Sequence, residues 1–135
     1  MTCVHLDTCF LIRSLVPGSP EDRSLRGWLE ARVPIAVSLI AWAEFLCGPV
    51  SKSDLEIARL VVGRPVPLTE ADAESAAGLF NGSGRRRGSF LDCLIAAVAI
   101  RMGTVLATSN AQDFRGFVEA GLEIADVAKT GPVVQ

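Results

Sequence analysis

Short apolar runs alternate with longer helix-type segments along the whole chain. Runs such as "CVHL" (3–6), "PIAVS" (34–38) and "TVLAT" (104–108) are short and rich in β-branched residues, as strands are. The segments between them carry apolar residues at helical spacing, capping residues and glycine stops. This alternation is typical of βαβ units, so the sequence predicts an α/β fold with a parallel sheet.

The expected elements fill the chain without a linker, an internal repeat or a second domain. We predict one domain over residues 1–135, with a core from about 3 to 127 and a tail at 128–135. Short edge strands are expected in "RPVPL" (64–68) and "LEIADV" (122–127), and "NGSGRRRG" (81–88) is expected to be a loop. Helices are expected over 8–16, 21–31, 39–47, 70–80, 90–102 and 111–121. A further helix is expected to begin with a capping box of Ser53 and Glu56 and to stop at Gly63.

Composition narrows the class of protein. The four cysteines form no C-x-x-C pair, and a zinc site would need ligands beyond the single His5. We expect reduced thiols, no membrane span and a cytoplasmic location, because no basic, apolar leader and no apolar run of about 18 residues is present. The net charge is −2, so any binding of nucleic acid must be local. Arg85, Arg86 and Arg87 form the one candidate patch, with a solvated loop as the alternative.

Acidic side chains stand at places where an apolar environment is expected. Asp92 opens a helix in which "CLIAAVAI" separates it from the next charge, and Glu44 is the only charge in "LIAWAEFLCG". Asp7 follows the first strand, and Asp113 opens a helix after "TVLAT". Each has a structural alternative: Asp7 can be an N-cap, Asp92 can form a capping box with Ser89, Glu44 can pair with an arginine, and Asp113 can be a helix-end charge.

A parallel α/β fold could bring these acids into one cleft, because ligand sites lie beyond the carboxyl ends of the strands. Thr108, Ser109 and Asn110 should lie at the same edge. Clustered carboxylates repel one another, so such a cleft makes sense mainly with cations bound. Oxygen-only ligands suit Mg²⁺ or Mn²⁺, which support hydrolysis of phosphodiesters. A serine or cysteine nucleophile is disfavoured, since the only histidine lies within a strand.

Three segments carry a resemblance to a known family. "VHLDTCFLI", "SLIAWAEFLCG" and "GSFLDCLIAAVAIRMGTVLATSNAQDF" resemble the successive motifs of PIN-domain ribonucleases, most closely the VapC-type toxins of toxin–antitoxin pairs. The resemblance runs from Val4 to Phe114, and its most specific block runs from Asp92 to Phe114. It implies a three-layer α/β/α domain whose central parallel sheet has four to five strands, with an acidic cleft that binds Mg²⁺ or Mn²⁺ and cuts RNA.

Residue by residue, the resemblance implies that Asp7, Glu44 and Asp92 are the first three acidic positions. Family members often have an acid at the fourth, where this chain has Asn110. Asp113 could supply the missing charge, or Asn110 could contribute its carbonyl oxygen. Thr108 and Ser109 could orient a water or a phosphate, or could simply end a strand.

The resemblance also implies partners: RNA as substrate, a small VapB-like antitoxin that lies across the cleft, and a second copy of the chain in a homodimer. The hydrophobic content of 50% fits a chain that hides surface in partners. Two other classes stay open. One is a PIN-like scaffold that binds without cleaving, which Asn110 would suit. The other is a phospho-acceptor receiver module. Such a module would need a further acidic pair near the first strand and a lysine after the last one, and the "LE" and "AKT" of this chain match that pattern poorly.

Overall fold

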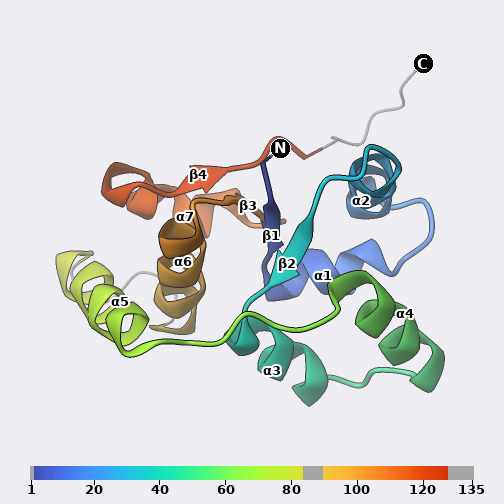
Figure 1. Ribbon diagram of the computed structural model, residues 1–135, viewed down its shortest axis with the longest axis horizontal. Coiled ribbons are helices and arrows are strands. Elements are labelled where there is room, and N and C mark those ends of the chain that lie inside the picture. The colour runs from blue at the N-terminus through green and yellow to red at the C-terminus, as the bar shows by residue number, and fades with distance from the viewer. Residues whose placement is uncertain (1, 84–89, 128–135) are drawn as a thin grey trace.

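The computed structural model describes residues 2–83 and 90–127. A small sheet stands between groups of helices (Figure 1). The elements in chain order are β1 (Val4–Leu6), α1 (Thr8–Ser14), α2 (Pro20–Glu30), β2 (Ile35–Val37), α3 (Leu39–Cys47), α4 (Lys52–Val62), α5 (Glu70–Gly82), α6 (Phe90–Met102), β3 (Val105–Ala107), α7 (Ala111–Phe114), the 3₁₀ helix η1 (Arg115–Ala120) and β4 (Glu123–Ile124).

All pairings in the four-stranded sheet are parallel, in the order β2-β1-β3-β4. Leu6 at the end of β1 lies beside Val37 of β2 and Ala107 of β3. The residues that follow these strands are therefore brought to one edge of the sheet. The α/β class and the parallel sheet predicted from the sequence are confirmed.

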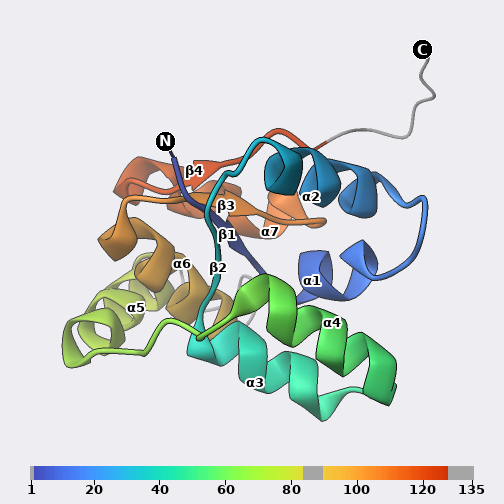
Figure 2. The same cartoon turned by 45° about the vertical axis from the view of Figure 1, so that its right-hand side comes forward.

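Helices cover both faces of the sheet. α5 and α6 lie together on one side, and α1 and α2 lie on the other in both views (Figures 1 and 2). The rings of Phe10 in α1 and Trp28 in α2 stack with centroids 5.7 Å apart. Such aromatic pairs add to the burial energy, which fixes these two helices against each other.

α6 is the most buried helix of the described residues, and its sequence explains why. Seven consecutive residues, Cys93 to Ala99, are buried, so almost no face of the helix meets water. The helix ends at Gly103, whose φ of 65° is a conformation that glycine adopts at little cost. Arg101 in its last turn donates from Nε to Oδ1 of the buried Asp72 at 2.8 Å, which ties α6 to α5.

His5 is a structural residue of the central strand. It is fully buried, and its Nδ1 lies 3.0 Å from Oγ1 of Thr104. Thr104 donates to the carbonyl of Ala99, so Nδ1 carries the proton and donates to the threonine. Burial, with a smaller effect of Arg101, lowers the pKa of His5 to about 4. Because the ring is buried in the middle of β1, it is not available to a nucleophile at the strand ends, as the sequence indicated.

Three local predictions need correction. The N-cap of α4 is Ser51, which accepts from the amide of Asp54 at 3.1 Å, so the predicted capping box of Ser53 and Glu56 is wrong. The helix therefore begins two residues earlier than predicted. The segment 64–68 forms only one bridge, between Val66 and Ser38, and the helix predicted over 111–121 divides into α7 and η1.

Several predictions lie outside the described residues. These are the conformation of the arginine loop at 84–89, the capping box of Ser89 with Asp92, and the tail at 128–135. In the described part of the chain, no helix is long and apolar enough to cross a membrane.

Candidate functional site

The site begins where β1 and β3 end side by side. The amide of Asp7 donates to the carbonyl of Ala107 at 3.1 Å, which places Asp7 next to Thr108. Strands as short as these leave the sheet after three residues, so the polar side chains that follow them gather immediately at its edge.

Asp7 is the N-cap of α1 and also an acid of the cleft. Its Oδ1 accepts from the amide of Phe10 at 2.8 Å, and the residue is 4% exposed. Burial raises the pKa of Asp7 to about 6; hydrogen bonds from Thr108 and Phe10 lower it, and the charges of Asp92 and Glu44 raise it further. The N-cap role is therefore observed, and the same side chain lines the pocket in which the sequence places the acids.

Glu44 and Asp92 approach Asp7 from two helices. Glu44 lies midway along α3, is half-buried, and its Oε1 accepts from the hydroxyl of Thr8 at 2.6 Å. Asp92 is in the first turn of α6 and is also half-buried. Both are close enough to perturb the pKa of Asp7, so three elements far apart in sequence converge on one carboxylate.

One pocket of about 250 Å³ contains all the predicted acids. Its lining is Asp7, Thr8, Cys9, Glu44, Asp92, Ile95, Asn110, Asp113 and Phe114. The fold thus brings Asp7, Glu44, Asp92, Asn110 and Asp113 together, as the sequence predicted. Asn110 and Asp113 are exposed at its rim, and Nδ2 of Asn110 lies 3.7 Å from the sulfur of Cys9.

The lining offers the oxygen atoms that a hard divalent cation prefers. A cation would also relieve the repulsion and the desolvation that raise the pKa of Asp7, so the donor set fits Mg²⁺ or Mn²⁺. Among residues 2–83 and 90–127, no group of three or more His, Cys, Asp and Glu side chains is already drawn together as a metal cage.

Thr108 and Ser109 face different neighbours. The hydroxyl of Thr108 bonds to Asp7 and accepts from the amide of Asn110 at 2.9 Å, so Thr108 positions two residues of the pocket. Ser109 turns away and donates to Oε2 of Glu21 at 2.7 Å. Thr8, Cys9 and Glu21 were missed from the sequence, since nothing in their local pattern distinguishes them from ordinary helix-end residues. Arg85, Arg86 and Arg87 lie outside the described residues.

Comparisons with known proteins agree with this fold. Residues 4–118 match the family model of the PIN domain. No curated protein sequence matches the chain significantly. Among solved structures, the chain resembles a chain of the VapBC2 complex of Rickettsia felis bound to a fragment of its promoter DNA. The two chains are 20% identical with a TM-score of 0.72, and the match covers 93% of this chain and 98% of that chain.

Two further structures give the same picture. The DNA-bound VapBC of Salmonella typhimurium is 20% identical with a TM-score of 0.69, covering 93% of this chain and 98% of that one. VapC20 of Mycobacterium tuberculosis, a toxin that cleaves the sarcin–ricin loop, is 20% identical with a TM-score of 0.63, covering 90% and 98%. At these identities the likeness shows a common fold.

Proposed function

Because the chain belongs to the PIN-domain family, we propose that it is a metal-dependent endoribonuclease that acts as the toxin of a toxin–antitoxin pair. The observation that carries this proposal is the single pocket shared by Asp7, Glu44, Asp92 and Asp113. The toxins named above support the RNA substrate and the toxin role.

Asp7, Glu44 and Asp92 would hold the ion, with Asp113 or Asn110 completing the site. When bound, Mg²⁺ or Mn²⁺ would supply a hydroxide-like nucleophile and stabilise charge on the phosphate oxygens. The remaining contributions come from the protein. Thr8 fixes the carboxylate of Glu44, and Thr108 and the amide of Phe10 hold that of Asp7. Fixed oxygens lose little freedom when they bind, which is the pre-organisation that a catalytic site needs. The three arginines at 85–87 are proposed to bind RNA phosphates nearby.

An apolar groove suits the proposed VapB-like partner. α1, α2 and α4 form a groove of about 190 Å³ whose apolar lining includes Leu11, Leu25, Leu29, Ile57 and Val61. Leu29 and Ile57 are 43% and 48% exposed, and Leu60 on α4 is 86% exposed. Apolar side chains exposed together mark protein interfaces. We assign this groove to an apolar segment of the antitoxin. The homodimer stays a prediction, which analytical ultracentrifugation of the purified protein would test.

Cleavage of RNA by purified variants tests the function. We expect Asp7→Asn and Asp92→Asn to lower the rate of Mg²⁺-dependent cleavage at least about a hundredfold, because each removes a charge that the ion requires. Asp54→Asn on α4 is the matched control, since it makes the same chemical change outside the pocket. Circular dichroism would establish that the variants are folded.

If both pocket variants cleave at the parental rate, the assigned site is wrong. If the parental protein binds RNA without cleaving it in Mg²⁺ or Mn²⁺, the scaffold alternative suggested by Asn110 takes the place of the nuclease.

A further inference from the structure

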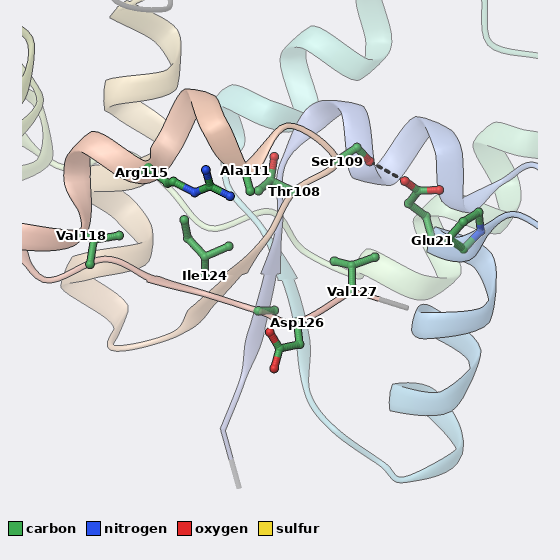
Figure 3. A pocket seen from close by; sticks show the side chains of 11 residues that line it. Glu21, Thr108, Ser109, Ala111, Arg115, Val118, Ile124, Asp126 and Val127 are labelled. Carbon is green, nitrogen blue, oxygen red and sulfur yellow. Dashed lines mark hydrogen bonds between the residues drawn. The ribbon is translucent and has the colours of Figure 1, made fainter. Parts of the chain in front are cut away.

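A second, larger cavity lies on the other side of the segment that follows β3. Its volume is about 710 Å³. Glu21 of α2 and Ser109 line one side, Arg115 of η1 lies opposite, and Val118, Ile124 and Val127 provide apolar surface (Figure 3). Asp126 is a third charged residue of the lining and lies between these two in this view (Figure 3). Charged groups around apolar walls suit a flat, polar-edged ring.

The two cavities share one wall, which is the segment from Thr108 to Ala111. Thr108, Ser109 and Ala111 line the larger cavity, and Asn110 lines the acidic pocket. Thr108 also bonds to Asp7. A polynucleotide with a phosphate at the acids can therefore place a neighbouring base in the larger cavity.

Glu21 is the unusual group of this cavity. It is 8% exposed, and the hydroxyl of Ser109 donates to its Oε2 at 2.7 Å. In the part of the chain that the structure describes, Glu21 forms no ion pair. A buried carboxylate with a single hydroxyl donor retains acceptor capacity, because an ionised carboxylate can accept about four hydrogen bonds. Further N–H donors would satisfy that capacity.

We propose that this cavity binds a guanine base next to the cleaved phosphate, an assignment that rests on the proposed ribonuclease function. Guanine presents two adjacent N–H donors, at N1 and N2, which match the two oxygens of the Glu21 carboxylate. Its Hoogsteen edge presents the acceptors O6 and N7, for which arginine is the usual partner. Arg115 lies across the cavity from Glu21 (Figure 3).

Other bases match this arrangement less well. Adenine and cytosine place a ring nitrogen acceptor beside their amino group, and that acceptor would repel one oxygen of the carboxylate. Uracil has one N–H between two carbonyl oxygens. Single-stranded RNA is commonly recognised through such edges of unstacked bases, so Glu21 becomes a specificity-determining residue.

Glu21→Gln tests the assignment, because the amide keeps the shape and can still accept from Ser109 but replaces one acceptor with a donor. We would sequence the ends produced from a randomised single-stranded RNA in Mg²⁺. The parental protein should favour guanine beside the cut, and Glu21→Gln should reduce that preference at least about tenfold. Glu30→Gln, on the exposed last turn of α2, should leave the preference unchanged.

A purely structural tie between α2 and β3 predicts a different result. It would lower the rate on every sequence alike and leave the preference intact. An unchanged preference in Glu21→Gln, or a parental protein that cuts without preferring guanine, overturns the proposal while the nuclease function stands.

Binding of mononucleotides tests the cavity without cleavage. In the Asp92→Asn protein without metal, GMP should perturb the NMR amide signals of Ser109 and Arg115 more strongly than AMP, CMP or UMP. Adding Glu21→Gln should abolish the difference. Equal perturbation by all four nucleotides would overturn the guanine assignment even if the parental protein proved not to cleave RNA.

Discussion

At the scale of single residues, Asp7 has one observed role and one proposed role, and the two roles need different charge states. As the N-cap of α1 it needs only an acceptor for the amide of Phe10, which a neutral side chain can provide. As the metal ligand that we propose, it would need its negative charge in a buried position beside two other acids. The cost of that charge shows in the pKa of Asp7, which burial raises from 3.8 to about 6.

The sign of the resulting pH dependence follows from linkage. Because the folded state binds this proton more tightly than the unfolded chain does, the contribution of Asp7 to stability falls as the pH rises from about 4 to about 6 and stays low above that. Asp7→Asn should therefore raise the free energy of unfolding of the metal-free protein by about 1–3 kcal/mol at pH 7.5, since Asn keeps the cap without the charge.

Urea unfolding at two pH values would measure this effect. Near pH 4 the two proteins should be almost equally stable, because Asp7 is then protonated in the folded state. A less stable Asp7→Asn protein at pH 7.5 would mean that the hydrogen bonds of the carboxylate outweigh its desolvation.

At the scale of elements, α4 has two faces with different tasks. Ala58 and Val62 are buried against the domain, whereas Ile57 and Leu60 remain exposed. The buried face stabilises the domain, and the exposed apolar face is available to a partner. Arg59 lies over the ring of Trp42, 5.4 Å from its centroid, and helps to fix α4 against α3.

We expect Ile57→Glu to abolish binding of the antitoxin, because a charge would have to be buried in the apolar groove. RNA cleavage should not change, since Ile57 lies outside the acidic pocket. Growth of cells that express the toxin variant together with its antitoxin would show the effect as a loss of rescue. Glu56→Gln, at the neighbouring exposed position, is the control. If cells that express Ile57→Glu are still rescued, the antitoxin binds at another surface.

At the scale of the whole molecule, the acidic pocket joins segments from both ends of the chain. Asp7 follows β1, Glu44 comes from α3, Asp92 from α6 and Asp113 from α7. An ion held there would bind only the folded state, because the unfolded chain does not bring these residues together. Ligands of this kind stabilise by about 2.7 kcal/mol at a concentration of 100 times Kd.

Thermal unfolding should therefore shift upward when Mn²⁺ is added, and more at pH 7.5 than at pH 5.5. The reason is that the ion must displace the proton of Asp7, whose pKa is about 6. Asp92→Asn should remove most of the shift, and Glu74→Gln on the exposed face of α5 should not. An equal shift in the parental and Asp92→Asn proteins would place the ion outside this pocket.

The sequence by itself determined the class of fold and the acidic residues of the pocket. Local patterns are enough for this: β-branched runs of strand length, N-caps such as Ser38 and Thr69, and isolated acids such as Asp92 in apolar surroundings. The bounds of α6 were also predicted correctly, because its apolar run ends at a glycine with positive φ.

Only the tertiary structure decided which neighbours those residues have. Ser109 lies one residue from Thr108, yet it contacts Glu21 and not Asp7, because successive side chains beyond a strand point to opposite sides. Glu21 is distant in sequence and looks like an ordinary acid in the first turn of a helix. The cavity between α2 and η1, and the partner groove between α1, α2 and α4, depend on how helices pack across the sheet, which is information that no local pattern contains.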